Sequence, residues 1–155
     1  MAAPVSPALD VGPPTLDRIR RAPKVLLHDH LDGGLRPETI IEIADQVGYT
    51  DLPSTDAEEL TTWMLRGANR KDLTLYLKTF AHTVAVMQTR DGIERVAREC
   101  AEDLAADGVV YAEIRFAPEL HTEQGLGLED AIEAVLAGFA TGSTGTDLTI
   151  RAICS

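Results

Sequence analysis

The order of apolar patterns along the chain constrains its fold more than any other feature of the sequence. Apolar runs rich in β-branched residues, typical of strands, occur at residues 25–27, 109–116 and 148–154. Helical periodicity separates them, at about 37–47, 73–87, 91–104 and 128–139. Strands that alternate with helices pair in parallel, so the sequence predicts an α/β fold, either an open sheet or a barrel.

Boundary residues support several of these elements. Pro37 suits the first turn of a helix, and Gly48 supplies a stop after it. Asp91 and Glu94 form an Asp-x-x-Glu pattern that predicts a capped helix start. Residues 49–72 show only weak periodicity, so we expect loops and short helical pieces there.

The two ends of the sequence differ in character. Residues 1–20 carry four prolines and no continuous apolar core, which predicts a flexible arm rather than a signal peptide or a membrane span. The third strand runs up to Ser155, and a three-stranded parallel sheet with two bare edges is a poor final structure. We therefore expect residues 21–155 to be a truncated, N-terminal portion of a larger domain, about three strand–helix units.

Composition excludes one class of partner and favours one compartment. The 155 residues include 25 Asp and Glu against 14 Lys and Arg, for a net charge of −11, and no basic run is present. Nucleic acid is therefore not an expected partner. The two cysteines, Cys100 and Cys154, lie in a helical and a strand pattern, which predicts buried, reduced thiols and a cytoplasmic protein.

A pair of histidines follows the first strand. Strand side chains alternate between faces, so His28 and His30 are expected to point the same way and Asp29 the other way. Two imidazoles at the carboxyl end of a strand could supply two ligands of a metal site, but a catalytic zinc takes three protein ligands. From spacing alone, a structural role for the pair remains the alternative.

Three motifs in order identify a family resemblance. They are PKVLLHDHLDG at residues 23–33 followed by RPET at 36–39, LTLYLKTF at 73–80, and VYAEIRFAP at 110–118. Together they resemble the adenosine deaminase family, close to its actinobacterial form, over residues 21–155.

The resemblance implies a zinc-dependent (β/α)₈ TIM barrel that hydrolyses adenosine and deoxyadenosine to the inosine product and ammonia. By position, His28 and His30 resemble zinc ligands, and His30 and Asp32 resemble contacts to the purine nucleoside, with Asp32 near the sugar. The apolar pocket wall would comprise Leu73, Tyr76, Leu77 and Phe80. The remaining zinc ligands and the proton-transferring groups are expected beyond residue 155, so this chain carries no expected catalytic residue. No membrane partner is implied, and the oligomeric state is not indicated.

Two alternative functions remain open from the sequence. One is a deaminase of adenine or another 6-aminopurine, and the other is an inactive fragment that binds metal or nucleoside weakly. Glu113 and Arg115 share one face of the second strand, and we expect them to form an internal ion pair. His82 and His121 are expected to be ordinary surface or partly buried histidines that bind no metal, although the place of His121 after the second strand would let it approach the site.

Overall fold

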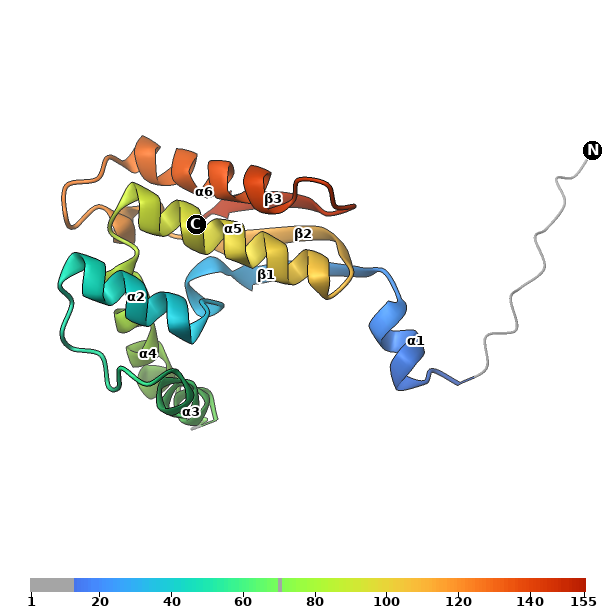
Figure 1. Cartoon of the computed structure of the whole chain (residues 1–155), viewed down its shortest axis with the longest axis horizontal. Coiled ribbons are helices and arrows are strands. Elements are labelled where there is room, and N and C mark those ends of the chain that lie inside the picture. Colours follow the sequence, from blue (N-terminus) through green and yellow to red (C-terminus); the bar gives the residue numbers. More distant parts are fainter. Residues whose placement is uncertain (1–12, 70) are drawn as a thin grey trace, which may run out of the picture.

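The computed structural model of the chain describes residues 13–69 and 71–155, without the side chains of residues 73–75. Its helices and strands follow one another in the predicted order (Figure 1). They are α1 (Leu16–Arg21), β1 (Lys24–His30), α2 (Pro37–Val47), α3 (Ala57–Ala68), α4 (Leu73–Val86), α5 (Arg90–Ala106), β2 (Val109–Phe116), α6 (Leu128–Gly142) and β3 (Thr149–Cys154), with short 3₁₀ turns η1 (Leu31–Gly33) and η2 (Pro118–His121) after β1 and β2.

The three strands form one parallel sheet in the order β1–β2–β3, which confirms the predicted α/β class. Helices α5 and α6 lie side by side across one face of this sheet, and α3 and α4 lie beyond the carboxyl end of β1 (Figure 1). No helix in the described part of the chain is long and apolar enough to cross a lipid bilayer. Of the expected N-terminal arm, residues 1–12 lie outside the described residues, and α1 has no buried residue.

Two predicted elements differ from the structure in detail. The segment expected to form loops and short helical pieces contains one longer helix, the 12-residue α3, because the side chain of Asp56 caps it at the amide of Glu59 and Leu60 is fully buried. Helix α5 is capped by Thr89, whose hydroxyl accepts from the amide of Gly92, so Asp91 lies in the first turn instead. Helix α2 begins at Pro37 as predicted, and Gly48 ends it in a left-handed conformation with φ 70°.

The core lies between the sheet and its covering helices. Alternate residues of β2, Ala112, Ile114 and Phe116, are buried against this layer. Helix α6 approaches α5 closely through Gly138, where a Cβ atom would lie 2.3 Å from the Glu94 carbonyl. This contact depends on the absence of a side chain at Gly138.

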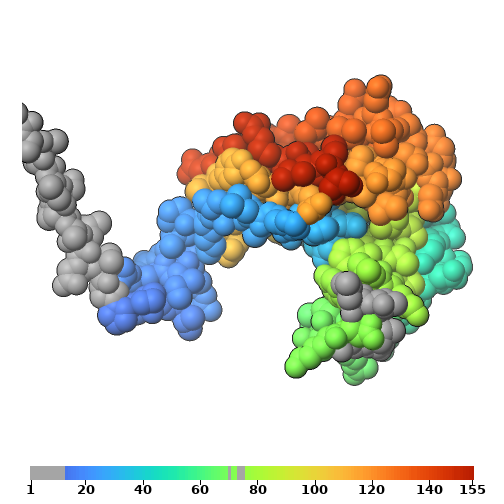
Figure 2. All heavy atoms as spheres, turned by 180° about the vertical axis from the view of Figure 1, so that it is seen from behind, coloured from blue at the N-terminus to red at the C-terminus, as the bar shows by residue number. Residues whose placement is uncertain are grey.

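The other face of the sheet is open within the described part of the chain (Figure 2). It exposes 62% of Val25 and 58% of Leu27 on β1, and β2 contributes Tyr111, Glu113 and Arg115 to the same face. Cys154 at the end of β3 is exposed, so the prediction that both cysteines are buried was wrong for it; Cys100 on α5 is partly buried. The candidate site lies at the carboxyl edge of this open face.

Candidate functional site

A β-bulge shapes the carboxyl end of β1. The pairing of β1 with β2 skips His28, whose φ of 65° lies in the left-handed region. Leu26 packs towards the helices, whereas Leu27 and His28 are consecutive and both exposed on the open face. The bulge brings the rings of His28 and His30 together on that face, with their centroids 5.6 Å apart.

Asp29 lies on the opposite side of the strand from the histidine pair. It pairs in register with the buried Ile114, and its Oδ1 accepts a hydrogen bond from the amide of His30 at 2.9 Å. Its charge also contributes to the raised pKa of Cys100 on α5, although burial of that thiol is the larger cause. Asp29 therefore holds the turn and does not join the two imidazoles.

Arg115 contacts the histidine pair from the neighbouring strand. Its Nη1 donates to Nε2 of His28 at 2.9 Å. The predicted ion pair between Arg115 and Glu113 was wrong, because no ion pair among the described residues joins them and Glu113 accepts from the hydroxyl of Tyr111 at 2.9 Å. Glu113 is bound by the residue two before it on β2, whereas Arg115 reaches across to β1, so the two charged side chains take different partners.

Asp32 lies in the η1 turn directly after the strand. Its side chain is only 13% exposed, and its Oδ1 lies 3.8 Å from Nδ1 of His30, which is too far for a hydrogen bond. This oxygen is buried and has no hydrogen-bond partner among the described residues. An unpaired buried carboxylate oxygen is costly, so it is an acceptor available to a ligand donor.

Helix α4 supplies an apolar wall beside Asp32. The rings of Tyr76 and Phe80 meet edge to face with centroids 5.1 Å apart, and Leu77 is 55% exposed on the same helix. A pocket of about 630 Å³ joins this wall to the strand ends. Its lining combines the predicted substrate contacts with neighbouring residues of α4, of the strand ends and of the turns that follow them. The lining residues are Asp29, His30, Asp32, Gly33, Tyr76, Leu77, Phe80, Val84, Phe116, Ala117, Leu120 and Ser155. The side chain of Leu73 lies outside the described part, so its predicted place in the wall is not described.

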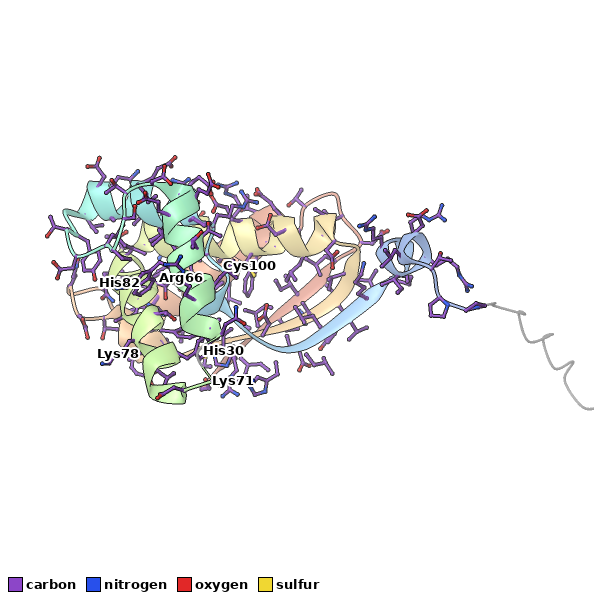
Figure 3. The ribbon with its side chains drawn as sticks, turned by 90° about the horizontal axis from the view of Figure 1, so that it is seen from below. His30, Arg66, Lys71, Lys78, His82 and Cys100 are labelled. Carbon is purple, nitrogen blue, oxygen red and sulfur yellow. The ribbon has the colours of Figure 1, made fainter. Side chains whose placement is uncertain are left out.

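A cluster of rings fixes α4 against the preceding helices. Nδ1 of His82 and the hydroxyl of Tyr49 share a hydrogen bond of 2.9 Å. The indole ring of Trp63 packs edge-on against the imidazole ring of His82. Burial lowers the pKa of His82, which favours the neutral ring. Figure 3 shows His82 on this helix and His30 near the end of β1.

His121 lies beside the site, which its place after the second strand allows, but it is buried and not at the surface or partly buried as expected. It ends the η2 turn, is 1% exposed, and stacks on Phe116, which lines the pocket. Burial lowers its pKa, and the charge of Asp32 acts in the opposite direction. Its Nδ1 has no hydrogen-bond partner among the described residues. The proximity of His121 to Asp32 arises from packing between two turns, for which the sequence carries no periodic signal.

The donor atoms fit part of a zinc site. Imidazole nitrogens are ligands that zinc prefers, and His28 and His30 present two of them on one face. Within the described residues, no group of three or more His, Cys, Asp and Glu side chains is placed to hold a metal ion. The chain therefore offers two candidate ligands, and a complete site needs at least one more.

Comparisons with known proteins agree with these features. Residues 23–155 match the sequence profile of the family described as adenosine deaminase. Adenosine deaminase 1 of Streptomyces coelicolor is 62% identical over 141 residues, a match that covers 91% of this chain and 36% of that protein. The chain thus spans little more than a third of the length of this relative.

Solved structures of deaminases and related amidohydrolases also resemble the fold of this chain. An adenine deaminase from Arthrobacter aurescens superposes with a TM-score of 0.73 at 34% identity, covering 86% of this chain and 39% of that one. An amidohydrolase from Burkhoderia ambifaria, solved with bound Zn, superposes with a TM-score of 0.71 at 25% identity, covering 94% and 40%. The three strand–helix units match part of the TIM barrel of these proteins, which confirms the predicted fold.

Proposed function

The chain belongs to the adenosine deaminase family, and from this premise we propose that it supplies the first part of the active site of a zinc-dependent enzyme that deaminates adenosine and deoxyadenosine. The observation that carries the choice of a nucleoside is the buried, unpartnered Oδ1 of Asp32 beside His30. In a pocket that is otherwise mainly apolar, this oxygen requires a donor, and a sugar hydroxyl provides one.

Each residue of the site has a role in this proposal. His28 and His30 hold zinc, which when bound lowers the pKa of water so that it becomes a nucleophile near neutral pH. Asp32 accepts a hydrogen bond from the sugar and fixes the position of the nucleoside. Tyr76, Leu77 and Phe80 cover the purine ring and exclude water from it. Proton transfer is assigned to no residue of this chain.

A second candidate function is the deamination of adenine. It is favoured by the structural similarity to the adenine deaminase of Arthrobacter aurescens, at 34% identity. Free adenine has no sugar hydroxyl, so Oδ1 of Asp32 could accept only from an N–H of the base itself. The nucleoside therefore accounts for the pocket better than the base does.

A chimera tests the proposal without depending on the activity of this chain by itself. In the deaminase of Streptomyces coelicolor, the aligned 141-residue segment is replaced by that of this chain. We expect the chimera to deaminate adenosine and deoxyadenosine in preference to adenine. Asp32→Ala is expected to raise KM for adenosine roughly 10- to 100-fold, because it removes a hydrogen bond to a charged acceptor.

Asp45→Ala on α2 is the matched control, because Asp45 is an exposed aspartate outside the pocket lining, and it is expected to leave KM unchanged. A preference for adenine, or an unchanged KM in Asp32→Ala, would contradict the nucleoside assignment. A folded chimera that binds adenosine but does not turn it over would favour the remaining alternative, a non-catalytic binder.

A further inference from the structure

The segment that carries Asp32 connects β1 to α2 and contains two consecutive glycines. We call residues 31–36 the connecting turn. Asp32 is followed by Gly33 and Gly34, and Arg36 is the residue at the N-terminal cap of α2. Glycine leaves the backbone more conformations than other residues do, and a Cβ atom at Gly34 would meet nothing within 4 Å. The geometry of the connecting turn therefore depends on what holds its two ends.

Burial holds the first end of the connecting turn. Leu31 is 1% exposed and belongs to the core, and its carbonyl accepts from the amide of Gly34 at 3.4 Å. Gly33 lies against the pocket wall, where a Cβ atom would be 3.5 Å from Cε1 of Phe80. A shift of the connecting turn would therefore move Asp32 relative to a ring that lines the pocket.

Arg36 holds the second end of the connecting turn, through contacts with α5. Its Nε and Nη2 donate to the two carboxylate oxygens of Asp103 at 3.0 and 2.6 Å, and Nη2 also donates to Glu102 at 3.3 Å. A planar guanidinium bound at two points fixes orientation as well as distance. Because the Arg36 side chain is 38% exposed, these ion pairs contribute orientation more than stability.

Helix α2 has a separate attachment to α5. The hydroxyl of Thr39 donates to Oε2 of the buried Glu99 at 2.6 Å. Arg95 donates to the other oxygen of Glu99 at 2.9 Å and pairs with Glu42 of α2 at 2.7 Å. These contacts do not involve Arg36, so its replacement is expected to loosen the connecting turn and to leave the helix in place.

We propose that Arg36 is a positioning residue that holds the carboxylate of Asp32 in place for the substrate by tying the connecting turn to α5. The inference rests on the proposed function, in which Asp32 binds the sugar of a nucleoside. Oδ1 of Asp32 has no hydrogen-bond partner among the described residues, so its position depends on the backbone of the turn. Arg36 lies four positions after Asp32 and ties that backbone to α5. An acceptor held in this way binds its donor better than one that moves.

A double-mutant cycle in the Streptomyces chimera tests this proposal. We expect Arg36→Met to raise KM for adenosine about fivefold with kcat nearly unchanged, because it weakens binding of the sugar and leaves the proposed zinc ligands in place. In the Asp32→Ala background the same replacement is expected to leave KM unchanged, since the acceptor is already absent. Arg36→Lys keeps the charge without the planar fork and is expected to raise KM by less than Arg36→Met.

Arg98→Met is the matched control. The side chain of Arg98 is 37% exposed, close to the value for Arg36, and it pairs with Glu99 and Glu102 of its own helix. Its replacement removes the same charge from the same cluster and is expected to leave KM unchanged. An equal rise of KM in Arg98→Met would reduce the effect to net charge and would overturn the inference.

The cycle separates failure of the inference from failure of the proposed function. An equal rise of KM on Arg36→Met with and without Asp32 would show that Arg36 does not act through that carboxylate, and would overturn the inference. An unchanged KM in Arg36→Met, beside a raised KM in Asp32→Ala, would also overturn it and leave the proposed function intact. An unchanged KM in Asp32→Ala would overturn the nucleoside assignment and the inference with it.

Hydrogen exchange of the 155-residue chain gives a second measurement, which needs neither substrate nor turnover. We expect Arg36→Met to speed exchange at the amide of Gly34, which donates to Leu31, about threefold, while the amides within α2 exchange as before. An unchanged rate at Gly34 would overturn the inference. Faster exchange throughout α2 would show that Arg36 only stabilises the helix, and would overturn it as well.

Discussion

The backbone at His28 determines which side chains the first strand presents to each face of the sheet. With φ at 65°, His28 lies in a region that non-glycine residues adopt at a cost. The bulge turns both Leu27 and His28 towards the open face and leaves Asp29 on the helix side. The contact of His28 with Arg115 and its proximity to His30 both depend on this local distortion.

This conformation gives a prediction at the scale of one residue. We expect His28→Gly to be more stable than His28→Ala by about 1 kcal/mol, because both variants lack the ring but only alanine strains the left-handed backbone. The free energy of unfolding in urea measures the difference. A more stable alanine variant would show that the strand is regular at this position and that the bulge is absent.

Sequence patterns could predict some of these residues and not others. Strand alternation predicted that His28 and His30 lie on one face, and they do. In a regular strand Leu26 would lie on that face as well, but the bulge at His28 leaves Leu26 on the helix-covered face. Nothing in the spacing indicated that Arg115 would bind His28 rather than Glu113. The place of His121 after the second strand indicated that it could approach the site, but not that it would be buried near Asp32. Contacts of this kind depend on packing between distant segments, which periodicity does not describe.

Some helices could be predicted from the sequence and others only in part. Their existence follows from apolar periodicity, so α2, α4, α5 and α6 were predicted within a few residues. Only short helical pieces were predicted where α3 lies, because only Leu60 and Gly67 are buried along it and the rest of its surface is mostly polar. Its stability comes from its cap and from contacts with its neighbours, including the ring cluster around His82.

The contact between α5 and α6 gives a prediction for this scale. A Cβ atom at Gly138 would lie 2.3 Å from the Glu94 carbonyl and 2.6 Å from the Cβ of Ala97, so Gly138→Ala must push the helices apart. We expect it to lower the free energy of unfolding by about 2 kcal/mol, even though alanine favours a helix.

Gly34→Ala serves as the control for that substitution. Gly34 has φ −116°, and a Cβ atom there would meet nothing within 4 Å. Its replacement is expected to change the free energy of unfolding by less than about 0.5 kcal/mol. Equal effects of the two substitutions in urea unfolding would contradict the close approach of α5 and α6.

At the scale of the whole molecule, the parallel order of the sheet and the family motifs were sufficient to predict the barrel portion. The strand order follows from alternation of strands and helices, and similarity to solved TIM-barrel deaminases confirms it. Composition and periodicity could not assign zinc or a nucleoside to the pocket. Those assignments came from the resemblance, and the geometry of His28, His30 and Asp32 now supports them as proposals.

In the proposed site, His28 and His30 are two ligands of one zinc ion, and Asp32 is reserved for the substrate. Elemental analysis of zinc in the purified Streptomyces chimera, after dialysis, tests it most directly. We predict that the chimera and its Asp32→Ala variant retain zinc, whereas His28→Ala and His30→Ala lose it while remaining folded. Full zinc retention in either histidine variant would contradict this proposal.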